Sequence, residues 1–172
     1  MPLLKSAPTP TGMWSFAFDC LACCSRWFSS ELVEYSLERM DHIGLLGCGT
    51  FGTVALVKCH ITGQSLALKA VSKGLLVHRK MQQSVKSEKT VMQRLHSPFA
   101  VRLMATFNTK NHVYFLTEAA LGGDLHTNYI RHSFFGSQVH GRFYTACVVR
   151  AFEHLHDRRI IYRDLKMENI VL

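Results

Sequence analysis

Three polar side chains that suit phosphoryl transfer lie close together in residues 161–169, whose sequence is IYRDLKMEN. Asp164 can orient a hydroxyl nucleophile and accept its proton, and Lys166 can neutralise a phosphoryl group as it moves. Asn169 can hold a metal ion through its carbonyl oxygen. A structural loop can carry such charges too, but these residue types at these offsets favour chemistry.

A lysine and a glutamate occupy positions where the pattern predicts burial. Lys69 lies inside the apolar run 65–71, and Glu88 fills a gap in the apolar stripe of a predicted helix. Because a lone buried charge is costly, each needs a partner. We expect the two to pair and to leave the ammonium oriented toward a phosphate. The alternative is that each side chain reaches water separately and buries only its stem.

Glycines are closely spaced in residues 47–54, GCGTFGTV. Gly47, Gly49 and Gly52 lack a Cβ, so backbone N–H groups there can approach phosphate oxygens. This spacing alone also fits a dinucleotide site, but that site needs a helix directly after the loop. A strand pattern follows instead, which favours a strand–loop–strand flap over a nucleotide. A glycine hairpin without a ligand is the alternative.

Strand patterns on both sides of the loop, and a second hairpin over 101–117, fill the first part of the chain. One helix is predicted over 78–95, where apolar residues recur at steps of three and four. After Gly122-Gly123 the pattern becomes helical, near 124–131 and 137–157. We therefore expect a strand-rich lobe and a helical lobe that meet in a ligand-binding cleft.

Length and composition fit about one globular domain, with 172 residues, 48% apolar and 19% charged. Lys and Arg outnumber Asp and Glu by 20 to 12, giving a formal net charge of +8 at pH 7. This charge suits anionic partners such as phosphates. We expect no nucleic-acid partner, because no aromatic platform accompanies the basic positions of 78–89.

We expect a cytoplasmic protein, because the sequence shows no secretory signal, no membrane span and no disulfide framework. Residues 13–30 combine aromatic side chains with Cys20, Cys23 and Cys24. Structural zinc would need four ligands, and S-acylation would attach this segment to a membrane. We favour an apolar strap or an unstructured extension over both, and expect residues 1–12 to be a flexible tail.

Taken in order, these segments resemble the protein-kinase signatures: G-x-G-x-x-G-x-V, the strand lysine, the helix glutamate and R-D-L-x-x-x-N. The resemblance covers about residues 40–172. Lys166 is typical of serine/threonine kinases, and Tyr162 in place of the usual histidine resembles the AGC group, nearest the cyclic-nucleotide-dependent kinases.

The resemblance implies an α+β fold. A five-stranded antiparallel sheet with one major helix would form an N-lobe at 37–120, followed by the beginning of a helical C-lobe at 121–172. Residues 1–36 would be an N-terminal extension that is partly flexible.

The resemblance also implies ATP and Mg²⁺ as cofactors and basic proteins or peptides as substrates, because Glu168 resembles an acidic site for arginine. Lys69, held by Glu88, would grip the α- and β-phosphates, and Asp164 would orient the substrate hydroxyl. Lys166 would serve the γ-phosphate and Asn169 a metal ion. The residues implied to surround the nucleotide are Gly47, Gly49, Gly52, Val54, Ala67, Glu118, Ala120, Asp124 and Val171.

Two departures from the family pattern affect the expected activity. Met167 stands where the family usually has proline, and the sequence ends at Leu172, before the D-F-G aspartate that ligates Mg²⁺. We therefore expect transfer by this chain alone to be impaired. The alternatives to an enzyme are a non-catalytic kinase-derived fragment that docks partners and a nucleotide sensor without transfer.

Overall fold

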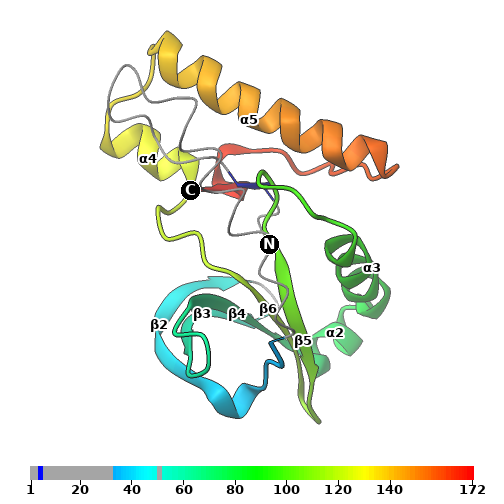
Figure 1. Ribbon diagram of the computed structural model, residues 1–172. Helices are drawn as coiled ribbons and strands as arrows, with labels where there is room; N and C mark the ends of the chain where they lie inside the picture. The colour runs from blue at the N-terminus through cyan, green and yellow to red at the C-terminus, as the bar shows by residue number, and fades with distance from the viewer. Residues whose placement is uncertain (1–3, 6–32, 50–51) are drawn as a thin grey trace.

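The computed structural model describes residues 4–5, 33–49 and 52–172 (Figure 1). The aromatic and cysteine-rich segment 13–30 and the tip of the glycine loop, residues 50–51, lie outside the described residues. Within the described part of the chain, no helix is both long enough and apolar enough to cross a membrane.

Five strands form one antiparallel sheet in the order β2-β3-β4-β6-β5. This finding confirms the predicted sheet. A short 3-10 turn, η2 (Leu37–Arg39), leads into it. The strands are β2 (Met40–Gly49), β3 (Gly52–Cys59), β4 (Ser65–Ser72), β5 (Leu103–Asn108) and β6 (His112–Glu118).

Both faces of the sheet are covered along β6. Phe115 and Leu116 are each 0% exposed and point to opposite faces, because side chains alternate along a strand. Leu116 packs with the cluster that includes Val57, and Phe115 packs with the cluster that includes Met92. Tyr35 also packs against the Leu116 cluster, so a residue of the predicted N-terminal extension contributes to the core of this lobe.

The helix predicted over 78–95 is present as α3 (Gln82–Gln93), shorter at both ends, and a further helix, α2 (Lys73–His78), precedes it and was not predicted. Lys80 lies between them in the left-handed region, with φ of 54°. Its N–H donates to the Val77 carbonyl at 3.1 Å and the Met81 N–H donates to the Leu76 carbonyl at 2.9 Å. These two bonds form a Schellman motif, which ends α2 without the usual glycine.

The helical lobe contains α4 (Leu125–Arg131) and α5 (Gln138–Asp157), close to the predicted bounds. A 3-10 turn, η3 (Met167–Asn169), and a short strand, β7 (Ile170–Val171), follow. One face of α5 is buried against Leu95, Leu125 and Ile170. Leu95 follows α3, so this core also holds the end of α3 against α5. The buried α5 residues are Tyr144, Cys147, Ala151 and Leu155.

Two residues of the predicted flexible tail form a strand. β1 (Leu4–Lys5) pairs in parallel with β7, in the register Leu4–Ile170 and Lys5–Val171. Val171 also forms an antiparallel bridge with Asp124, which must lie on the other edge of β7. β7 is therefore paired on both sides, and Figure 1 shows β1 beside the C-terminal segment.

Candidate active site

Lys69 and Glu88 form an ion pair that joins β4 to α3. The Lys69 Nζ lies 2.9 Å from Glu88 Oε1, and the two side chains are 19% and 24% exposed. The Lys69 Nζ also lies 5.7 Å from the centroid of the Phe115 ring, on the adjacent strand β6. The predicted pairing is confirmed, and the alternative that each side chain reaches water separately is wrong.

Packing among the described residues explains one of the three glycines of the loop. A Cβ at Gly52 would lie 1.7 Å from the Ala70 carbonyl oxygen of β4, so close strand packing excludes any side chain there. A Cβ at Gly47 would meet no described atom within 4 Å, and one at Gly49 would meet only the Gly52 carbonyl oxygen, at 3.8 Å. Packing among the described residues therefore leaves room for side chains at Gly47 and Gly49. A ligand that must approach the backbone closely would be a reason for glycine at these two positions.

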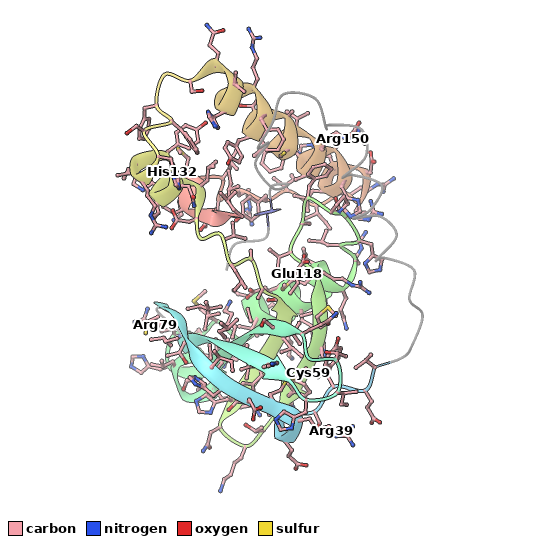
Figure 2. The ribbon with its side chains drawn as sticks, turned by 60° about the vertical axis from the view of Figure 1, so that its left-hand side comes forward. Arg39, Cys59, Arg79, Glu118, His132 and Arg150 are labelled. Carbon is pink, nitrogen blue, oxygen red and sulfur yellow. The ribbon has the colours of Figure 1, made fainter. Side chains whose placement is uncertain are left out.

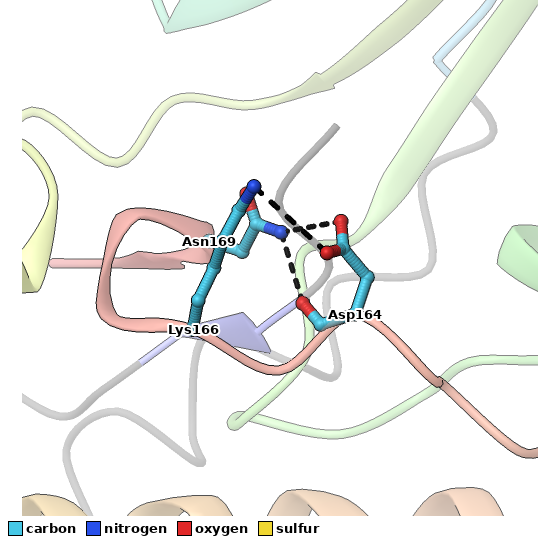
Figure 3. Close-up of polar contacts among 3 residues, drawn as sticks. All are labelled: Asp164, Lys166 and Asn169. Atoms are coloured by element: carbon cyan, nitrogen blue, oxygen red, sulfur yellow. Dashed lines mark hydrogen bonds and ion pairs between the residues drawn. The ribbon is translucent and has the colours of Figure 1, made fainter.

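Lys166 and Asn169 both contact Asp164 (Figure 3). Asn169 donates from Nδ2 to Asp164 Oδ2 at 2.7 Å and to the Asp164 backbone carbonyl at 2.9 Å. The Lys166 Nζ lies 3.8 Å from Asp164 Oδ1. The 3-10 turn η3 places Asn169 for these bonds, and Arg163 enters the loop with φ of 61°.

These contacts orient a carboxylate that solvent can reach, since the Asp164 side chain is 67% exposed. Because the side-chain N–H₂ of Asn169 points to Asp164, the side-chain carbonyl oxygen of Asn169 is the atom that can ligate a cation. A carboxylate and an amide oxygen are ligands that Mg²⁺ accepts, with waters and substrate phosphates completing its shell. The donor set therefore fits the metal, although the described residues contain no group of three or more His, Cys, Asp or Glu side chains that could hold one.

Asp124 begins α4 as its N-cap, a role that the sequence interpretation missed. Its Oδ1 accepts from the Thr127 N–H at 2.8 Å and its Oδ2 accepts from the Thr127 hydroxyl at 2.7 Å. Burial alone would raise the pKa of this carboxyl, but the hydrogen bonds from Thr127 and from the Asp124 backbone, together with His126, bring the pKa below its ordinary value. The sequence signal was present, because Asp directly before an apolar helical run is a common cap.

The residues predicted to contact adenine lie on strands of the sheet and on the connection to the helical lobe. Val54 pairs with Lys69 across β3 and β4, and Ala67 pairs with Thr117 of β6. The Glu118 carboxylate accepts from the Arg102 N–H at 2.9 Å, so the side chain fixes the end of β6. Figure 2 shows Glu118 at the end of the sheet that faces the helical lobe. Ala120 follows two residues later.

The connection between the lobes is held by the end of the chain that follows η3. The Gly122 N–H donates to the Leu172 carbonyl and the Leu172 N–H donates to the Gly123 carbonyl, both at 2.9 Å. Val171 is thereby placed beside Asp124, which brings two predicted nucleotide contacts together. A Cβ at Gly122 would lie 2.8 Å from the Leu172 Cβ, so this close approach requires glycine.

Two cavities of the described residues lie at α3, away from the predicted cleft between the lobes. A groove of about 530 Å³ separates α2 and α3 from β5 and β6, and is lined by residues such as Leu76, Val85 and Phe115. A smaller cavity of about 170 Å³ lies between Met92 and β5. The structure thus forms two clusters, Lys69 with Glu88 and Asp164 with Asn169, on separate lobes.

Residues 40–172 match the family model described as the protein kinase domain. The chain belongs to this family. The match has the bounds expected from the sequence motifs, and the sheet, α3 and the loop at Asp164 are the beginning of a kinase domain.

Similar proteins include kinases of several animals. The chain is 42% identical over 148 residues to cGMP-dependent protein kinase, isozyme 2 forms cD5/T2, of Drosophila melanogaster, covering 86% of this chain and 16% of that protein. It is 41% identical over 145 residues to serine/threonine-protein kinase N2 of Danio rerio, covering 83% and 15%. It is 40% identical over 144 residues to cAMP-dependent protein kinase catalytic subunit PRKX of Homo sapiens, covering 84% and 40%.

These relatives are consistent with a serine/threonine kinase domain of AGC type, as the sequence motifs predict. The chain spans less than half the length of each of the three.

Proposed function

We propose that the chain supplies the ATP-binding lobe and the catalytic loop of an AGC-type serine/threonine protein kinase. The observation that supports this most directly is the Lys69–Glu88 pair, which fixes an ammonium on the same sheet as Gly47 and Gly49. A carboxylate that holds a lysine amine in place leaves its remaining N–H donors for an anion. In this family, the expected anion is ATP, which offers two phosphate oxygens to the lysine.

In the proposed reaction, Asp164 accepts the proton of a serine or threonine hydroxyl. The hydroxyl oxygen then forms a bond to the γ-phosphorus of ATP while the bond to the β–γ bridging oxygen breaks and ADP leaves. Asn169 holds the Asp164 carboxylate in the orientation this step needs, and Lys166 lies close enough to Asp164 to face the transferred group. Mg²⁺ would neutralise the phosphates when it is bound.

ATP binding tests the first part of the proposal. We expect the chain to bind Mg²⁺-ATP in calorimetry and Lys69→Met to weaken that binding at least about tenfold, because one ion–phosphate contact contributes roughly 1.5–3 kcal/mol. Lys58→Met, which removes an exposed lysine of the adjacent strand β3, serves as the matched control and should leave the affinity unchanged. No binding by the unaltered chain, or equal loss in both variants, would contradict the proposal.

A phosphotransfer assay separates the kinase from its alternatives. We propose basic peptides as substrates, because Glu168, in η3 of the loop, offers a carboxylate for an arginine of the substrate. A chain that binds ATP and phosphorylates an arginine-containing serine peptide supports the enzyme. Binding without any phosphopeptide, in the chain and in a version extended to its full reading frame, supports a nucleotide sensor. Neither binding nor transfer supports a non-catalytic docking fragment.

We further propose that the protein is cytoplasmic. Cys48 and Cys59 are free thiols in the described part of the chain, which suits a reducing compartment. Fractionation of cells that express the full reading frame would test this location, and recovery with membranes would favour the S-acylation alternative for residues 13–30, which lie outside the described residues.

A further inference from the structure

The C-terminal ends of α3 and α5 lie together, and each ends at an arginine that binds the other's last carbonyl. Arg94 is the C-cap of α3 and Arg158 is the C-cap of α5. The Arg94 Nη2 donates to the Arg158 carbonyl at 2.9 Å, and the Arg158 Nε donates to the Arg94 carbonyl at 3.0 Å. Cationic side chains at helix C-termini satisfy unpaired carbonyls and interact favourably with the helix dipole. Here each helix receives its cap from the other helix.

Two histidines extend this contact. The His96 N–H donates to His154 Nε2 at 3.1 Å, and Arg158 Nη1 donates to the His154 carbonyl at 3.1 Å. Between Arg94 and His96, Leu95 is 2% exposed and packs in the same apolar cluster as Leu155. Three polar contacts and one buried apolar contact therefore hold the segment 94–96 on α5.

The contact has a direct route to the ion pair of the candidate site. Glu88 lies on α3 six residues before Arg94, which is less than two helical turns, and the helix between them is unbroken. At its other end, α3 begins after the turn at Lys80, and Met81 supplies no side-chain cap. Met81 and Val85 pack there against an apolar cluster of the sheet. The C-terminal end is held in addition by its contacts with α5, so those contacts help to set where Glu88 lies relative to β4.

We propose that Arg94 and Arg158 are positioning residues, a reciprocal arginine clamp that fixes α3 on α5 and so keeps Glu88 against Lys69. The clamp touches neither the ion pair nor a substrate. It acts by limiting the rotation and sliding of α3, and it joins the lobe that contains Lys69 to the lobe that contains Asp164. Only the role of the ion pair in binding ATP rests on the proposed function; the effect of the clamp on the ion pair does not.

The accessibility of the Lys69 amine reports the ion pair without any enzyme activity. In the folded chain, an amine-reactive acylating reagent should modify Lys69 slowly, because its ammonium is bound to Glu88 and is largely buried. We expect Arg158→Gln and Arg94→Gln each to raise the rate of Lys69 modification, measured by peptide mass spectrometry, about threefold or more. The rate at the exposed Lys58 is the internal reference and should not change.

Two further variants make the test specific. Arg159→Gln removes an exposed arginine one position along the chain and should leave the Lys69 rate as it is. Arg158→Lys keeps the positive charge, but a single ammonium group cannot reach the carbonyls of both Arg94 and His154. We therefore expect a rate of Lys69 modification between those of the unaltered chain and Arg158→Gln. The Arg94→Gln/Arg158→Gln double variant removes both bonds of the clamp, so its rate should be at least as high as that of either single variant.

Unchanged Lys69 modification in Arg158→Gln and Arg94→Gln, even with a lowered melting temperature, would overturn the clamp and leave only a structural contact. The same holds if Arg159→Gln raises the rate as much as Arg158→Gln does. If the glutamine variants do not fold, the Arg158→Lys rate decides: a value equal to that of the unaltered chain contradicts the proposal. A chain that shows the expected rates but does not bind Mg²⁺-ATP retains the clamp and refutes the proposed function.

Discussion

The Lys69 ammonium and the Glu88 carboxylate meet at 2.9 Å although 19 residues separate them in the sequence. β4 places the lysine in the middle of the sheet and α3 brings the glutamate across from it. Each charge is partly withdrawn from water, so each depends on the other for its stability.

A double-mutant cycle should show this dependence. Lys69→Met and Glu88→Gln each leave one partner without its counter-charge, and we expect each to lower the free energy of unfolding by about 1 kcal/mol. The double variant should lose less than the sum, with a coupling free energy of about 1 kcal/mol in urea denaturation. Strictly additive losses would show that the two side chains do not stabilise each other.

Two glycines of the same loop should respond in opposite ways to alanine. Gly52→Ala places a Cβ on the Ala70 carbonyl oxygen, so the β3–β4 pair must separate, and we expect a loss of about 3 kcal/mol or more in unfolding free energy. Gly47→Ala meets no described atom, and its stability should stay within about 1 kcal/mol of the parent. Under the proposed function, Gly47→Ala should instead weaken ATP binding. Equal stability of the two variants would contradict the strand packing described above.

The contact between His96 and His154 should make stability depend on pH. Burial, with Arg158 and His96 adding to it, lowers the pKa of His154, and Asp157 opposes this shift. Neutral His154 accepts the His96 N–H, and Arg94 adds further positive charge at this junction. A group with a lowered pKa in the folded chain stabilises the fold above its unfolded pKa of 6.5, and this contribution is lost as the pH falls below that value.

Urea denaturation at pH 7.5 and pH 5.5 measures this loss. His154→Gln removes the titrating group and should reduce the difference in unfolding free energy between the two pH values. His78→Gln, which changes an exposed histidine at the end of α2, is the matched control and should leave the difference as it is. If His154→Gln showed the full pH dependence of the parent chain, His154 would not be its source.

Proline at position 167 should stabilise the loop. Met167 is the first residue of η3, a position where the missing N–H of proline costs nothing, and Lys166 before it is extended, as a residue before proline must be. We expect Met167→Pro to raise the unfolding free energy by up to about 1 kcal/mol, less whatever packing the Met167 side chain contributes. Glu168→Pro, one position into the turn, should destabilise it, because Met167 would then be held in a helical conformation before proline. Thermal denaturation of both variants shows whether each substitution raises or lowers the stability.

Regular patterns and fixed spacings in the sequence predicted much of the fold and part of the site. Alternation identified the strands, the steps of three and four identified α5, and the charge of Lys69 in an apolar run identified its need for Glu88. The role of each predicted nucleotide contact stays a prediction.

The missed features depend on local conformations and distant partners that leave no periodic signal. The predicted helix began at residue 78, but Lys80 adopts the left-handed conformation usually given to glycine and separates α2 from α3, so α3 begins only at Gln82. The clamp of Arg94 and Arg158 joins side chains to carbonyls 64 residues apart, and two arginines in a sequence do not indicate a contact. The pairing of β1 depends on two residues in a segment without any strand pattern.

The parallel pairing of Leu4–Lys5 with Ile170–Val171 has a practical consequence for experiments. Neighbouring strands are about 4.8 Å apart, so Leu4 and Lys5 lie one strand spacing from residues that directly follow Asn169. A bulky purification tag fused directly at this end would press on the loop, whereas a small fluorophore there would sense its motions. A cleavable tag joined through a long spacer, or one attached at the Lys110 turn of the sheet, avoids that interference.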